Sequence, residues 1–327
     1  MIKNQNKTLL HLPLTDWIGL GIFLIIIVIM FFIYPSCMGN TQTPAEWLAA
    51  IWNDKSDYEH GWMIPLFSVF MSWHAAKTLK DEPVKGNLNG LWIIALGAFF
   101  FLVSLRTLQP RAAIVSFPFL MWGAVWVYWG KRFAYRLTFP FFYILLAIPM
   151  PGIQQATVHL QLMSTEMAHW GANLFGVETI MEGTTIHAVN SDWDTFNIAG
   201  GCSGIRSLMA LLMISIAWAY LADKMALWKR VILALSAIPL AIVGNGFRVA
   251  SILICAEHIN PAFAGKAWHD WSGLLLFFPA TLFGLTVLHS LLAGEIPFIK
   301  KRKVVIRRSE STASETTTEQ KGEQNHD

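Results

Sequence analysis

Charged residues are scarce in this chain. They make up 14% of its 327 residues, whereas apolar residues make up 54%. A soluble protein is about one quarter charged, so the scarcity excludes an ordinary soluble enzyme, and the mean hydropathy of +0.47 agrees. The net charge of +3 is too small to indicate a nucleic-acid partner. The composition therefore predicts a polytopic membrane protein.

Several motifs of soluble chemistry are absent as well. The histidines show no spacing such as His-x-x-x-His, which would indicate a metal site. The stretch Gly244-Asn245-Gly246 follows no strand and lacks the spacing of a dinucleotide-binding loop. We find no internal repeat and no segment large enough to fold as a soluble domain. One membrane domain with neither metal nor cofactor is expected.

Long apolar runs indicate the membrane helices. A helix needs about 20 apolar residues to cross a bilayer, and about eight runs qualify: 17–34, 62–79, 88–105, 112–130, 133–150, 205–221, 231–256 and 272–292. Pro118, Pro140 and Pro149 leave the division of the fourth and fifth runs open. We therefore expect an all-α polytopic fold with a membrane domain over 17–292. It is preceded by a short segment, 1–16, and followed by a basic and then disordered tail, 293–327.

The distribution of lysine and arginine predicts the orientation. With eight helices, both termini lie on one side. That side carries Lys3, Lys7, Lys77, Lys80, Lys85, Lys131, Arg132, Arg136, Lys224, Lys229, Arg230 and the tail cluster 300–308. The other side carries Lys55, Arg106, Arg111, Arg206, Arg248 and Lys266. Because cytoplasmic loops are enriched in lysine and arginine, both termini are expected to be cytoplasmic.

The segment 154–199 is long for a loop and is expected to be partly structured. Residues 156–175 carry apolar side chains at helical spacing, which predicts a helix lying at the membrane interface. Residues 178–198 carry β-favouring residues around the turn residues Asn190-Ser191-Asp192. A small extracytoplasmic hairpin is therefore predicted before the sixth helix.

The hairpin leads into a glycine-rich turn that opens the sixth helix, Gly200-Gly201-Cys202-Ser203-Gly204. The glycines allow a tight turn and the close approach of a substrate backbone. A helix N-terminus lowers the pKa of a nearby thiol, and Arg206 should add to this effect. Cys202 is therefore the candidate nucleophile. Cys37 and Cys255 are expected to be small buried residues or, at most, a mutual disulfide.

Arg248 lies within an apolar run, where a charge costs at least ~2.5 kcal/mol at the centre of a membrane helix. The simple alternative is an arginine that reaches to the outer interface. Asn245 lies three residues earlier on the same face, and Gly244 and Gly246 weaken the helix around it. A merely interfacial arginine needs no such arrangement. We expect the Arg248 guanidinium to stabilise an oxyanion or a substrate carbonyl.

His269 lies between Trp268 and Asp270, in what we expect to be the outer loop before the eighth helix. Interfacial histidines beside tryptophan are common without catalysis. Asp270 is left out of the site, because adjacent side chains rarely orient one another. His60, at the outer start of the second helix, is either an interfacial residue or a wall of the site.

All three candidates, Cys202, Arg248 and His269, fall on the expected outer side. A thiol, a guanidinium and an imidazole are the parts of a cysteine acyl-transfer site. His269 would take the thiol proton and later protonate the leaving amine. The pattern indicates a membrane-embedded cysteine peptidase or transpeptidase.

The motifs resemble those of the exosortase/archaeosortase family, in the same order along the chain. The resemblance covers roughly 17–292 and rests on His60-Gly61, Arg136, Ala147-Ile148-Pro149-Met150-Pro151, Cys202-Ser203-Gly204, Asn245-x-x-Arg248 and His269-x-x-x-Gly273. Each motif alone is weak, whereas the ordered combination is specific. Archaeal relatives often have arginine in place of the histidine, so His269 points to the bacterial branch.

The resemblance implies a multi-pass protein of the bacterial inner membrane that acts as a cysteine transpeptidase. Its partners would be membrane lipids and exported proteins with a C-terminal sorting signal: a short motif such as Pro-Glu-Pro, one transmembrane helix and a basic tail. By analogy with soluble sortases, the catalytic set would be Cys202, Arg248 and His269. Arg206, Asn245, Ser203, Gly204 and His60 would support it. The acceptor nucleophile and the oligomeric state stay open.

Two other functions remain alternatives. A transferase for lipid-linked sugars would need paired outer carboxylates, and the available acids show no such pair beside an apolar groove. A transporter would need inverted repeats and helices broken at the midplane. Gly244-Asn245-Gly246 is one such break, but no matching half exists.

Overall fold

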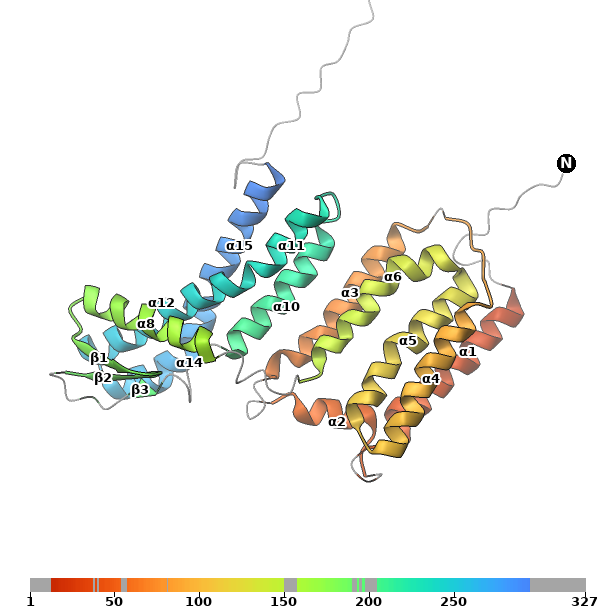
Figure 1. Ribbon diagram of the computed structural model, residues 1–327, viewed down its shortest axis with the longest axis horizontal. Coiled ribbons are helices and arrows are strands. Elements are labelled where there is room, and N and C mark those ends of the chain that lie inside the picture. Colours follow the sequence, from red (N-terminus) through yellow and green to blue (C-terminus); the bar gives the residue numbers. More distant parts are fainter. Residues whose placement is uncertain are drawn as a thin grey trace, which may run out of the picture.

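The computed structural model of the chain describes residues 13–37, 39, 41–53, 58–80, 82–149, 158–189, 193, 196–197 and 205–294. Cys202, Ser203 and Gly204 lie outside the described residues, as do 1–12 and the tail from 295 onward. The described part is mostly helical, with one small sheet. Helices lie in two groups, and α10 (Ile205–Leu221) runs between them (Figure 1).

The first group holds the amino-terminal helices, which pack side by side. They are α1 (Leu14–Val28) with the π-helical turn η1 (Ile29–Ile33), α2 (Pro44–Ile51), η3 (Glu59–Trp62), α3 (Met63–Lys77), α4 (Gly90–Thr107), α5 (Pro110–Trp129), α6 (Lys131–Tyr143) and η4 (Ile144–Ala147). Gly130 separates α5 from α6. Its φ of 95° suits glycine, and a Cβ at this position would clash with the Lys85 carbonyl oxygen. Pro118 and Pro140 stay inside α5 and α6.

The second group lies on the other side of α10 (Figure 1). It contains α8 (Val158–Leu174), α11 (Leu227–Leu235), α12 (Ala237–His258), α13 (Pro261–Phe263), η5 (Ala264–Trp268), α14 (His269–Ser272), η6 (Gly273–Phe277) and α15 (Phe278–Ala293). The last five of these form one continuous helical stretch in which η5 and η6 are π-helical turns.

Eight spans are not shown. Five described segments are long and apolar enough to cross a membrane: Leu14–Ile33, Gly90–Thr107, Pro110–Trp129, Leu227–His258 and Pro261–Ala293. The other three predicted runs are helical too, but they are shorter. Their helices α3, α6 and α10 hold 15, 13 and 17 residues, fewer than the ~20 that span a bilayer core. The chain is a multi-pass membrane protein with five candidate spans.

The predicted hairpin is present, with a different turn. Strands β1 (Thr179–Glu182) and β2 (Thr185–Ala188) pair antiparallel, with Glu182 opposite Thr185, and reverse at Gly183, whose φ is 62°. The expected turn residues 190–192 lie outside the described part. Beyond them, β3 (Phe196–Asn197) adds to β2. Gly183 was not predicted as a turn residue, although glycine is the residue that such turns favour because they need a positive φ.

The sheet is fixed to the end of α12. Ile186 and Trp193 are buried in one apolar cluster with Val249 and Ile252 of α12. The Trp193 indole Nε1 donates to Glu257 Oε2 at 2.7 Å. These contacts hold the sheet over the carboxyl-terminal half of α12, the half that carries Arg248.

The glycines of α12 do not break the helix, so the expectation of a weakened or broken helix at 244–246 is wrong. The helix is continuous over Ala237–His258. A Cβ at Gly244 would lie 2.6 Å from the Thr281 Cγ2 atom of α15, and one at Gly246 would lie 2.8 Å from the Met167 Cβ atom of α8. Small residues here let three helices approach closely. The transporter alternative thereby loses its one broken helix.

Candidate active site

Arg248 is held by two hydrogen bonds across a helix interface. Its Nε donates to the Ser272 hydroxyl at 3.1 Å, and its Nη2 donates to the His269 carbonyl at 3.0 Å. The Ser272 hydroxyl donates to the same carbonyl at 3.1 Å. Arg248 is only 9% exposed. The guanidinium is therefore fixed inside the protein. The simple alternative, an arginine that reaches to the outer interface, does not hold.

These bonds explain how a buried guanidinium is tolerated. An unpaired buried charge is strongly unfavourable, whereas polar partners offset its loss of water. Ser272 and the His269 carbonyl use two of the five N–H groups, which leaves donors for a further partner. Gly273 contributes no side chain here: a Cβ at this position would lie 3.8 Å from Arg248 Nε.

His269 lies across the helix interface from Arg248, whose Nη2 donates to its backbone carbonyl, and its setting differs from the expected loop. It is the first residue of α14, inside the continuous helical stretch and between two π-helical turns. Such turns are frequent at functional sites. Its Nδ1 lies 3.1 Å from Asp270 Oδ1. The premise for leaving out Asp270, that adjacent side chains rarely orient one another, does not hold here, because the two side chains meet.

A second network holds the backbone of Arg248. Its carbonyl accepts from the Ser251 hydroxyl at 2.6 Å, and that hydroxyl accepts from the Trp268 indole Nε1 at 3.1 Å. Trp268 directly precedes His269. The Ser251–Trp268 bond is thus a second link between α12 and the helical stretch that carries His269. The sequence analysis overlooked Ser251 and Ser272. Their position three residues after Arg248 and after His269 was the available signal.

The supporting residues fall in two places. Asn245 is 1% exposed and lies one turn before Arg248 on α12. His60 is buried in η3, with its ring centroid 5.0 Å from that of Tyr58. Gly61 packs against the Trp52 indole too closely to admit a Cβ. His60 is therefore a fixed part of the start of α3.

Arg206 lies at the beginning of α10, between the region of His60 and the region of Arg248. Its Nη1 lies 3.3 Å from Glu59 Oε2, the residue before His60, and both side chains are about half exposed. This ion pair connects the first turn of α10 to η3. Two residues later, Leu208 shares an apolar cluster with Ala241 of α12 and Phe277 of η6. The first turns of α10 therefore lie between the His60 and the Arg248 regions.

The structure brings Arg248 to the backbone carbonyl of His269 and pairs Arg206 with Glu59, the neighbour of His60; the catalytic roles of these residues stay a prediction. The structure does not describe Cys202, Ser203 or Gly204, so the thiol's position relative to either pair stays a prediction. The other two cysteines are free and buried, in separate apolar clusters, so the suggested mutual disulfide is absent. Burial raises the pKa of the Cys37 thiol, which opposes its ionisation.

No cluster of three metal-ligating side chains occurs among the residues that the structure describes. In comparisons with known proteins, the family model for transmembrane exosortases (Exosortase_EpsH) matches residues 52–286. No curated protein and no solved structure matches the chain. The match covers Arg248, His269, His60, Arg206 and Cys202 together, and it spans well over half of the sequence.

Proposed function

The chain belongs to the transmembrane exosortase family, and from this premise we propose that it is a membrane-embedded cysteine transpeptidase. It cleaves the C-terminal sorting signal of exported proteins through a thioacyl-enzyme on Cys202. The observation that carries the proposal is the buried Arg248 guanidinium, held by Ser272 and the His269 carbonyl with donors to spare.

The proposed reaction has two steps. The Cys202 thiol passes its proton to His269, and the sulfur attacks the carbonyl carbon of the scissile peptide bond. Negative charge develops on the carbonyl oxygen, where Arg248 donates hydrogen bonds. The C–N bond then breaks as His269 returns the proton to the leaving amine. A second nucleophile, either water or an amine, attacks the thioester and releases the thiol.

Asp270 acts as a positioning residue in this scheme. When its carboxylate accepts a hydrogen bond from His269 Nδ1–H, the Nε2 lone pair is left for the thiol proton. The Asp270 side chain is 74% exposed, and an exposed pair contributes up to about 1 kcal/mol. Its effect on rate should therefore be modest beside that of Cys202 or Arg248.

The direct test is the new C-terminus of a substrate. We expect co-expression with an exported protein of the same bacterium, ending in a motif, a transmembrane helix and a basic tail, to yield a shortened product. Intact-mass and peptide mass spectrometry would locate the cut and identify any attached group. An unshortened C-terminus in the presence of the inserted enzyme would contradict the proposal.

We also propose that the site faces outward and that both termini are cytoplasmic, in the bacterial inner membrane. Alkaline phosphatase is active only outside the cytoplasm, so fusions after Gly176 and Pro261 should be active. Fusions after Leu79, Gly130 and Leu221 should be inactive. An inactive fusion at Gly176 would put the thiol on the wrong face and would contradict this orientation.

A further inference from the structure

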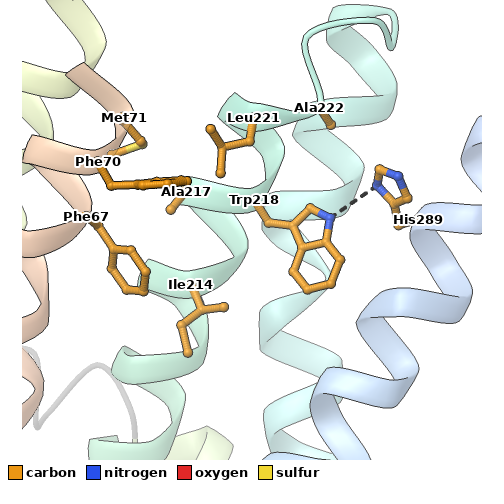
Figure 2. A pocket seen from close by; sticks show the side chains of 9 residues that line it. All are labelled: Phe67, Phe70, Met71, Ile214, Ala217, Trp218, Leu221, Ala222 and His289. Carbon is orange, nitrogen blue, oxygen red and sulfur yellow. Dashed lines mark hydrogen bonds between the residues drawn. The ribbon is translucent and has the colours of Figure 1, made fainter. Parts of the chain in front are cut away.

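An apolar cleft lies between α3, α10 and α15, away from Arg248 and His269. It has a volume of about 260 Å³ and is lined by Phe67, Phe70, Met71, Ile214, Ala217, Trp218, Leu221, Ala222 and His289 (Figure 2). We propose that this cleft binds the transmembrane helix of the sorting signal, an inference that rests on the proposed function.

The lining selects an apolar occupant. Seven of the nine residues are aliphatic, methionine or phenylalanine, and they approach one another from facing helices (Figure 2). A cavity of about 150 Å³ accommodates one benzene molecule. The cleft therefore has room for roughly two large apolar side chains, projecting from one face of a helix that lies alongside it. It is too small to enclose a whole helix.

The rim of the cleft continues into an exposed apolar stripe on α3. The stripe consists of Leu66, Val69, Phe70 and Trp73, all among the exposed large apolar residues. Their spacing of three and four residues places them on one face of the helix. A stripe at this spacing is the surface that a second apolar helix packs against. Phe70 belongs to both the stripe and the cleft.

Most of the cleft is formed by α3 and α10, and candidate site residues lie at or just before the beginning of each of these two helices. α3 follows directly on Glu59 and His60, and α10 begins three residues after Cys202. The Arg206–Glu59 ion pair ties these two beginnings together. A helix lying along α3 and α10 would thus have one end at the ion pair. The segment preceding that helix would then lie beside the first turn of α10, which begins three residues after Cys202 in the sequence.

Length distinguishes a peptide helix from a lipid chain. From Arg206 to Leu221, at the far end of the cleft, α10 rises about 22 Å at 1.5 Å per residue. One leaflet contributes about 15 Å, half of the bilayer core. A lipid chain in one leaflet would therefore cover only part of the length from Arg206 to Leu221. A sorting-signal helix of about 20 residues is long enough.

His289 adds a polar contact inside the cleft. The Trp218 indole Nε1 donates to His289 Nδ1 at 3.3 Å (Figure 2). With Nδ1 as the acceptor, the neutral ring carries its proton on Nε2. That N–H is a donor suited to a hydroxyl or a carbonyl oxygen on the bound helix. A serine or threonine among apolar residues of the sorting helix is the chemistry that fits.

Site-specific photo-crosslinking tests this proposal. Phe70 would be replaced by p-benzoylphenylalanine in the full-length enzyme with Cys202→Ala, co-expressed with the substrate described above. Phe99, a comparably exposed phenylalanine in the middle of α4, is the matched control. Both replacements preserve an aromatic side chain. We expect an enzyme–substrate adduct from position 70 at a yield at least about ten times that from position 99.

Two outcomes overturn the inference. Equal substrate adducts from both positions, or lipid adducts alone from position 70, would show that the cleft does not select the sorting helix. Wild-type processing, measured in parallel, separates this failure from that of the proposed function. Normal cleavage without the position 70 adduct overturns the cleft alone, whereas absence of cleavage overturns the function and the cleft with it.

Discussion

Cys202→Ala should abolish processing of the sorting signal while the protein remains inserted in the membrane. In the proposed mechanism the Cys202 thiolate forms the acyl-enzyme, and no other group takes that covalent step. Cys202→Ser should retain very little activity, because a hydroxyl ionises far less readily than a thiol. The measurement is the fraction of co-expressed substrate with a new C-terminus, normalised to enzyme in the membrane fraction.

Cys37→Ala and Cys255→Ala are the matched controls, because each removes a thiol from the same chain. Both side chains are buried, and burial raises the pKa of Cys37. At neutral pH Cys37 therefore stays protonated and should react slowly with iodoacetamide. Labelling of the wild type should fall on Cys202 and should coincide with loss of activity. Normal processing by Cys202→Ala would refute the mechanism.

Much of the helical architecture was predictable, because a membrane helix consists of a long run of apolar residues. Each of the eight predicted runs contains helix in the structure, although five candidate spans are shown. The difference arises from length: α3, α6 and α10 hold 15, 13 and 17 residues, fewer than the about 20 that span a bilayer core. Hydropathy does not report where an α-helix ends. The helix α6 ends at Tyr143, and the chain continues as the 3₁₀ helix η4.

Residues whose role depends on facing helices were harder to predict. Arg248 stood out because a charge in an apolar run is unfavourable. Ser272 did not, since serine is common in membrane helices and only its distance to Arg248 identifies it. The glycines of α12 were misread for the same reason. Local propensity favours a break at glycine, but packing against Met167 and Thr281 preserves the helix.

The neighbourhood of His269 shows a further limit. From the sequence it was placed in a loop because it falls between the apolar runs 231–256 and 272–292, and the structure instead continues the helix through two π-helical turns. A π-helical turn changes which side chains share a face. No periodicity computed for a regular α-helix reports that change. The pairing of His269 with Asp270 was therefore visible only in three dimensions.

Arg248→Lys should be nearly as inactive as Arg248→Ala, with a loss on the order of 10²-fold or more, as for a missing oxyanion donor. The guanidinium uses Nε for Ser272 and Nη2 for the His269 carbonyl, and it still has N–H groups for the substrate. Lysine has a single ammonium nitrogen. It cannot hold both partners at separate nitrogens and also face the oxyanion.

Arg206→Lys is the matched control, since it makes the same substitution in a half-exposed arginine that contacts one carboxylate. A lysine can keep that ion pair, so this variant should retain most of its activity. Arg206→Gln removes the positive charge near Cys202 and should move the pH dependence of iodoacetamide labelling upward. Processing yield and labelling rate against pH would be measured for all four variants, with thermal stability in detergent to identify misfolding. A fully active Arg248→Lys, or an inactive Arg206→Lys with unchanged labelling, would show that the two roles are assigned wrongly.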